Sequence, residues 1–231
     1  AFSILNNTKS KCIVTFIGLH GLAEYITNKK YRKALHSSDF IFCDSIFVQF
    51  INFYYNKKFK IKSPGPDVTN ELLKLISIKN ISVGFFGGSK KLIGCVNNNF
   101  NIPCNKLEQI IPGNVIIDDN FTLNDEALKI LEMKSKIIFV GLGCPKQEIL
   151  SSTISNNNKI FIPIGAAINF LTDDEVRAPK FLRLIGFEWL WRGIISPKRV
   201  FIRNLKSLYI VLKNEINRSM KAIIIAYACH P

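Results

Sequence analysis

Short apolar runs alternate with longer stretches of helical periodicity along most of this chain. The apolar runs are typical of buried strands, which we expect at residues 12–17, 40–43, 81–86, 114–117, 136–140 and 160–164. The helical spacing of apolar residues predicts helices between them, at residues 22–37, 67–78, 90–99, 124–133 and 146–155. This alternation predicts an α/β fold with a Rossmann-like, largely parallel sheet and helices on both faces.

The last part of the chain has a different pattern. Ser196 and Pro197 are typical of a helix start, as N-cap and first helical residue. One face of this predicted helix is apolar and carries Phe201, Leu205, Leu208, Leu212 and Ile216. The roughly opposite face is cationic and carries Arg199, Arg203, Lys206 and Lys213. We therefore expect an α/β core at residues 1–175 and a basic helical appendage at residues 176–231. Such a helix suits an anionic membrane surface, and the alternative is a helix that packs its apolar face on the core.

Charge changes this picture more than overall composition does. The 231 residues have a formal net charge of +14, and residues 177–221 hold eleven Lys or Arg against two acids. Such a block favours phosphate-bearing partners: nucleic acid, anionic lipid headgroups or a diphosphate substrate. The six cysteines contain no C-x-x-C pair, which with only three histidines argues against a metal site and for reduced thiols. No apolar run approaches the length of a membrane span. The start at Ala1 rather than Met is consistent with an upstream segment.

Two glycine turns connect a predicted strand to a predicted helix. The first is V-G-L-G-C-P-K-Q-E at residues 140–148, with the candidate binding residues Gly141, Gly143, Pro145, Lys146, Gln147 and Glu148. Free backbone N–H groups at such a helix start bind anions, and an amide such as that of Gln147 can form paired bonds to a uracil or sugar edge. The second turn, F-F-G-G-S at residues 85–89, offers Gly87, Gly88 and Ser89 to a phosphate. It lacks the G-x-G-x-x-G fingerprint of dinucleotide-binding proteins.

Asp44 is the best-placed candidate for catalysis. It follows the apolar run 40–43, and ligands of open α/β sheets bind at the carboxyl ends of strands. It could take a proton from a sugar hydroxyl, or simply cap the helix that follows. Thr15, near the end of the first predicted strand, could bond a substrate or align Asp44, although strand propensity alone explains a Thr there. The candidate diphosphate ligands are the arginines of the basic segment: Arg177, Arg183, Arg192, Arg199 and Arg203.

In this order, the motifs resemble the WecG/TagA/CpsF family of bacterial glycosyltransferases. The resemblance rests on G-L-G-C-P-K-Q-E (141–148), G-A-A-I-N-F-L-T (165–172), R-A-P-K-F-L-R-L-I-G-F-E-W-L-W-R (177–192) and S-P-K-R (196–199). The segments P-G-P-D (64–67) and F-F-G-G-S (85–89) add weaker support, and the similarity extends from Thr15 to about Arg203.

The resemblance implies an inverting, metal-independent transferase that needs no cofactor. Such an enzyme moves an N-acetylmannosamine-type sugar from a UDP donor to a polyprenyl-diphosphate-linked N-acetylglucosamine, in the synthesis of a cell-surface polysaccharide. The family's catalytic base falls on Asp44, its important threonine on Thr15 and its glutamine on Gln147. Its basic membrane-docking appendage matches Arg192, Arg199 and Arg203 best. The resemblance further implies a cytoplasmic protein, peripheral on the inner face of the cell membrane. Family members form dimers or trimers, so a homo-oligomer is an open alternative.

The chain departs from the family pattern at three positions. Ile17 stands where the family has Asn, and Ser45 stands where it has Gly after the aspartate. Asn169, in the expected substrate pocket, stands where the family has Asp, which removes a negative charge. This last difference bears on the identity of the donor sugar more than on the class of reaction.

Two other functions are compatible with the composition. A nucleic-acid-binding α/β protein would account for the charge, but RNA-binding proteins more typically spread basic and aromatic residues over an exposed sheet or a set of loops. A nucleotide-dependent oxidoreductase would bind nicotinamide at the Gly87–Gly88 turn, where the fingerprint is absent. We therefore predict a transferase with no nucleic-acid partner.

Overall fold

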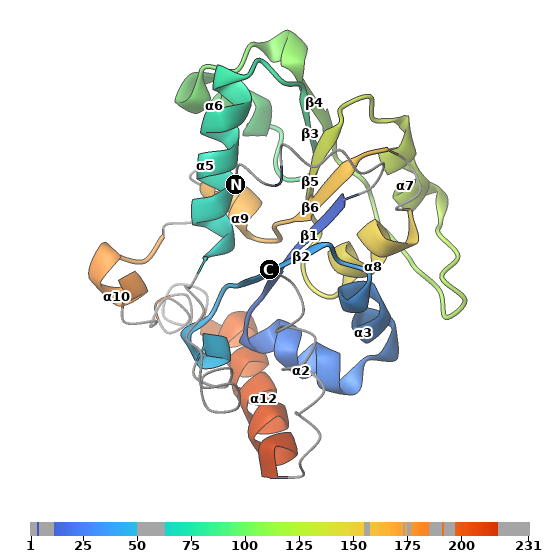
Figure 1. Ribbon diagram of the computed structural model, residues 1–231, viewed down its shortest axis with the longest axis vertical. Coiled ribbons are helices and arrows are strands. Elements are labelled where there is room, and N and C mark those ends of the chain that lie inside the picture. Colours follow the sequence, from blue (N-terminus) through green and yellow to red (C-terminus); the bar gives the residue numbers. More distant parts are fainter. Residues whose placement is uncertain are drawn as a thin grey trace.

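A six-stranded parallel sheet forms the centre of the protein. The computed structural model describes residues 4, 12–49, 63–154, 158–172, 174, 177–184, 191 and 197–216. The strands lie in the order β2-β1-β6-β5-β3-β4, and every neighbouring pair is parallel (Figure 1). They are β1 (Cys12–Ile17), β2 (Phe40–Cys43), β3 (Val83–Gly87), β4 (Leu107–Ile110), β5 (Ile137–Gly141) and β6 (Ile160–Pro163). The predicted Rossmann-like sheet is thus confirmed.

Helices cover both faces of this sheet. They are α2 (Leu19–Thr27), α3 (Lys29–His36), α5 (Gly65–Ile78), α6 (Leu92–Phe100), α7 (Asp125–Leu128), α8 (Lys146–Thr153), α9 (Ala167–Phe170), α10 (Lys180–Leu184) and α12 (Pro197–Ile216). Helices α5, α6 and α9 cover one face, and α2, α3, α7 and α8 cover the other (Figure 1). Strands buried on both faces read as continuous apolar runs. Phe85 of β3 and Phe139 of β5, for example, are fully buried and stack with ring centroids 5.4 Å apart.

Side-chain caps decide where two of the helices begin and end. The single helix expected at 22–37 is wrong, because Asn28 divides it into α2 and α3. Its Oδ1 accepts hydrogen bonds from the N–H groups of Lys30 and Tyr31, at 3.0 and 3.1 Å, and so caps α3. The helix expected at 124–133 is also shorter than predicted: α7 passes into a 3-10 turn, η2 (Lys129–Glu132).

The strand predicted at 114–117 is wrong, and the sixth strand is β4 instead. The only ladder contact described in 114–117 is an isolated bridge from Ile117 to Leu123. The Asn124 side chain accepts from the Ile116 N–H at 3.0 Å and donates to the Asn114 carbonyl at 2.8 Å. These bonds satisfy backbone groups that a strand would have used, so the segment remains a loop.

The C-terminal helix α12 packs along α2 (Figure 1). Its buried side chains at this contact are Ser207 and Val211. By contrast, Phe201, Leu205 and Leu212 of the predicted apolar face are 37%, 47% and 55% exposed. The alternative that this face packs on the core is therefore wrong for these three residues. The described helices include none with both the length and the hydropathy of a bilayer-spanning segment.

Candidate active site

A pocket of about 270 Å³ opens at the carboxyl edge of the sheet. Its walls come from Gly18 after β1, Asp44 after β2, Gly143 after β5, Gly165 after β6 and Arg203 of α12. The strands β2, β1, β6 and β5 are consecutive in the sheet, so their parallel order brings these turns to one place. This is the edge at which open α/β sheets bind ligands.

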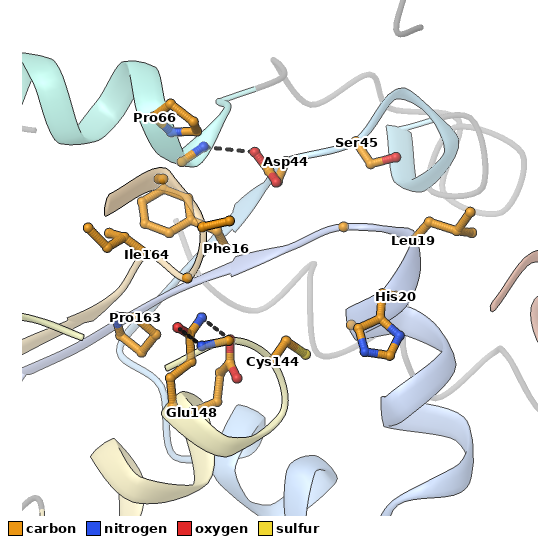
Figure 2. A pocket seen from close by; sticks show the side chains of 18 of the residues that line it. Phe16, Leu19, His20, Asp44, Ser45, Pro66, Cys144, Glu148, Pro163 and Ile164 are labelled. Carbon is orange, nitrogen blue, oxygen red and sulfur yellow. Dashed lines mark hydrogen bonds between the residues drawn. The ribbon is translucent and has the colours of Figure 1, made fainter. Parts of the chain in front are cut away.

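Asp44 lies on one side of the end of β1, opposite the start of α8 (Figure 2). Its backbone N–H donates to the Ile17 carbonyl at 3.0 Å, which extends the β1–β2 pairing to the aspartate. Its Oδ1 accepts a 2.7 Å hydrogen bond from the N–H of Gly65, the first residue of α5. A negative charge is favoured at a helix N-terminus. Its Oδ2 lies near Gly18, where an added Cβ would be 3.7 Å from that oxygen. The glycine therefore leaves space beside a carboxylate of fixed orientation.

Gln147 and Glu148, at the start of α8, line the pocket. Figure 2 shows Glu148 on the side of the pocket opposite Asp44. The Gln147 Oε1 accepts from the Gly143 N–H at 3.2 Å, and its Nε2 donates to the Glu148 Oε1 at 2.8 Å. Gly143 has a φ of +84°, a conformation that favours glycine. Both side chains are almost completely buried. The turn thus holds a polar amide and a carboxyl group in a fixed arrangement.

Burial also changes the protonation of groups along this wall. It raises the pKa of Glu148 from its usual range to about 7, against the hydrogen bond from Gln147. Burial and then the charge of Arg203 lower the pKa of His20. Burial, followed by the charge of Glu148, raises the pKa of the Cys144 thiol well above its ordinary value. At neutral pH the wall therefore carries a neutral imidazole, a neutral thiol and a carboxyl group near its midpoint of ionisation.

Similarity to known proteins identifies the family to which this pocket belongs. The sequence matches the Glycosyl transferase WecG/TagA/CpsF family over residues 2–221. The chain belongs to this family. One relative is the N-acetylglucosaminyldiphosphoundecaprenol N-acetyl-beta-D-mannosaminyltransferase of Staphylococcus aureus strain NCTC 8325. The two sequences are 24% identical over 192 residues, and this alignment covers 80% of the present chain and 72% of the relative. The chain is also 25% identical over 201 residues to a Bacillus spizizenii W23 protein of the same name, covering 84% and 75%. The protein is thus a glycosyltransferase.

Five of the residues predicted to act in a WecG/TagA/CpsF enzyme meet in the pocket. They are Asp44, Gly143, Gln147, Glu148 and Arg203. They come from three separate parts of the sequence, and only the sheet order and the packing of α12 on α2 bring them together. Their individual roles stay predictions.

Other predicted residues lie outside the pocket wall. Thr15 is fully buried in β1, with its Oγ1 2.7 Å from the Ser38 Oγ, so its direct contact is with the protein. Gly141 lies under α9, where an added Cβ would be 2.8 Å from Ile168. The residues lining the pocket also do not include Pro145, Lys146 or Asn169.

The Gly87–Gly88–Ser89 turn lies at the end of β3, also outside the pocket lining. Its carbonyls at Gly87 and Ser89 both accept hydrogen bonds of 3.0 Å from the Gln109 side chain. The Ser89 hydroxyl donates to Asp174 at 2.8 Å. These contacts account for the turn as part of the scaffold, and its predicted contact with a phosphate stays a prediction.

The predicted diphosphate ligands have different positions. Arg177 and Arg183 both approach the Asp67 carboxylate, at 2.6 and 3.6 Å. The Arg177 guanidinium also lies over the ring of Phe170, a residue of the pocket wall, 5.6 Å from its centroid. Arg192 lies outside the described residues, as does the side chain of Arg199. Of the predicted arginines, the described pocket wall contains Arg203.

The pocket residues that were not predicted from the sequence include His20, Cys144 and Asn204. The strand-end argument that found Asp44 applies equally to His20, which follows β1 by three residues. It was missed because the helix was expected to begin at Leu22 rather than Leu19. The His20 Nδ1 lies 3.1 Å from the Ser207 Oγ, which joins α2 to α12 at the pocket.

Proposed function

We propose that this glycosyltransferase moves an N-acetylmannosamine-type sugar from a UDP donor to a polyprenyl-diphosphate-linked N-acetylglucosamine. The observation that carries the proposal is the Asp44 carboxylate, half-buried and held by the Gly65 N–H in the same pocket as Arg203. The names of the two relatives supply the sugar and the acceptor, an N-acetyl-beta-D-mannosaminyl group and N-acetylglucosaminyldiphosphoundecaprenol. Such a reaction contributes to a cell-surface polysaccharide.

In the proposed mechanism, Asp44 acts as the general base in a single displacement that inverts the configuration at the anomeric carbon. Its carboxylate takes the proton of the acceptor hydroxyl as that oxygen forms a bond to the anomeric carbon. The bond from this carbon to the diphosphate breaks on the opposite side, and its electron pair leaves with UDP. The Arg203 guanidinium stabilises the charge that develops on the diphosphate, as fixed cationic donors do. Neither a metal ion nor a cofactor takes part in these steps.

We also propose that α12 attaches the enzyme to the inner face of the cell membrane. Its exposed apolar side chains include Phe201, Leu205 and Leu212, and its exposed cationic ones include Lys206 and Lys213. An apolar stripe beside basic residues suits an anionic lipid surface.

A transfer assay tests the proposed reaction. The purified protein is incubated with UDP-N-acetylmannosamine and a short-chain lipid-diphosphate N-acetylglucosamine in the presence of EDTA. We expect a lipid-linked disaccharide, with the new linkage in the β configuration. Thermal stabilisation by a different UDP-sugar, without product, would contradict the proposed donor. The absence of both product and UDP-sugar binding would refute the proposed function.

A further inference from the structure

His20 lies where three parts of the chain meet at the pocket. It is the second residue of α2, and Figure 2 shows its half-buried ring at the start of that helix. Its Nδ1 lies 3.1 Å from the Oγ of Ser207 in α12, a residue 187 positions away in the sequence. The ring also has a hydrogen bond with the backbone of Cys144, in the turn before α8. One side chain therefore connects α2, the glycine turn and α12.

The hydrogen bonds of Ser207 join His20 to the backbone of Arg203. Ser207 is 2% exposed, and its hydroxyl donates to the Arg203 carbonyl, one helical turn earlier, at 2.8 Å. A hydroxyl has one hydrogen to donate, so the Ser207 oxygen accepts its second bond from the His20 Nδ1–H. Two consecutive hydrogen bonds thus lead from α2 to the turn of α12 whose Arg203 side chain lines the pocket.

The apolar contact between α12 and α2 is small. The described side chains of α12 that are buried there are Ser207 and Val211, and Val211 packs in the same apolar cluster as Leu22 of α2. Apolar contacts have no preferred direction, whereas a hydrogen bond weakens steeply when its atoms are misaligned. A rotation of α12 by one residue, about 100°, would turn Arg203 away from the pocket. The bond between His20 and Ser207 opposes this rotation.

We propose that His20 is a positioning residue for sugar transfer, which through Ser207 holds the turn of α12 that presents Arg203 to the substrate. The inference rests on the proposed function, in which Arg203 stabilises the charge that develops on the leaving diphosphate. Such stabilisation requires a donor that is in place before the reaction, and a displacement of about 1 Å can cost about 100-fold in rate. In this role His20 acts on the reaction only through Arg203.

Steady-state kinetics of four variants test this role, with UDP-N-acetylmannosamine and the short-chain lipid acceptor as substrates. His20→Ala and Ser207→Ala should each lower kcat by about 10-fold to about 100-fold and change the KM of the donor less. His20→Asn should restore kcat to within a few-fold of wild type, because its amide N–H can replace the Nδ1–H. Arg203→Ala and the double variant His20→Ala/Arg203→Ala should be equally slow, since residues that act as a unit are not additive.

His36→Ala is the matched control. His36, the last residue of α3, is also a histidine with a side-chain hydrogen bond, from its Nε2 to the Tyr25 hydroxyl over 3.0 Å. It lies outside the pocket lining, so its replacement should leave kcat near the wild-type value. Thermal unfolding of both alanine variants shows how much stability each loses. A loss of kcat in His20→Ala alone, at similar stability, would assign the kinetic effect to the position of α12.

Three kinetic results would overturn the proposal while leaving the proposed function intact. The first is a wild-type kcat in His20→Ala. The second is a double variant whose loss equals the product of the two single losses, because His20 would then act on the substrate independently of Arg203. The third is an equal loss of kcat in His20→Asn and His20→Ala.

Amide hydrogen exchange tests the anchoring of α12 without substrate. His20→Ala should raise the exchange rate of the α12 amides around Ser207, and His36→Ala should not. Unchanged exchange in His20→Ala would overturn the proposal even if the enzyme is active. A wild-type protein that forms no product, but whose α12 is loosened by His20→Ala, would refute the proposed function and support the anchoring of α12 by His20.

Discussion

Replacement of Asp44 by Asn removes the proposed base while leaving the local structure almost unchanged. The Asn Oδ1 can still accept the 2.7 Å hydrogen bond from the Gly65 N–H. That bond changes from a charged to a neutral one, which should cost about 1 kcal/mol of stability. In a protein of this size, the melting temperature should fall by about 2–4 °C. The loss of a general base should instead lower kcat by about 100-fold to about 10,000-fold, or about 3–5 kcal/mol in the barrier.

The assay compares product formation under saturating donor and acceptor with calorimetric binding of UDP. Asp39→Asn is a suitable control, because Asp39 lies at the other end of β2 and accepts a 2.9 Å hydrogen bond from the Ile13 N–H. This variant makes the same chemical change at the opposite end of the same strand, and its activity should stay near that of the wild type. Turnover of Asp44→Asn within a few-fold of wild type would remove Asp44 from the role of base. Loss of UDP binding along with activity would instead indicate a role in binding.

Three further predictions test the scaffold and the surface. Gly87→Ala should destabilise the protein more than Gly143→Ala, because the added Cβ at residue 87 would lie 2.8 Å from a carbonyl oxygen of β5, whereas nothing lies within 4 Å of a Cβ at residue 143. At residue 143 only the strain of the positive φ remains, about 1–2 kcal/mol. Equal losses of stability in urea unfolding would contradict this prediction. Burial alone would raise the pKa of Glu108, but backbone and side-chain donors before β5 bond its carboxylate and lower the pKa. The ionised carboxylate should therefore stabilise the folded protein at neutral pH, and this stabilisation should be lost as the pH falls through the lowered pKa. Glu108→Gln should narrow the difference in unfolding free energy between neutral and acidic solution. Leu212→Glu should weaken sedimentation with anionic vesicles, whereas Ile78→Glu, also at an exposed site, should not.

The fold could be predicted from the sequence because most strands are buried on both faces. Strands β3, β5 and β6 therefore consist almost entirely of apolar residues. The edge strand β4 lacks this signal, since its four residues are only half-buried and two of them are polar. Glu108 and Gln109 are satisfied there by backbone groups more than 20 residues away in the sequence. Local periodicity cannot indicate such partners.

The candidate site was predictable where it depends on strand ends and unpredictable where it depends on helix packing. Asp44 follows directly from its position after an apolar run. The burial of Glu148 could not be anticipated, since the third residue of a helix is more often exposed and ionised. The orientation of α12 could not be predicted either. Its apolar pattern favours a face with Leu205 and Leu212, but the helix contacts α2 through the small side chain of Ser207.

The position of Arg203 affects how truncated forms of this protein can be interpreted. The sequence invites a cut between a core and an appendage near residue 175, and a shortened chain would be expected to lose only membrane attachment. In the structure, however, α12 supplies Arg203 and Asn204 to the pocket wall. Removing the helix would therefore open the pocket and remove the proposed membrane contact at the same time, and an assay of the shortened chain could not separate the two effects. Single substitutions on the outer side of α12 change the surface and leave the pocket wall intact. They therefore test membrane binding separately from catalytic activity.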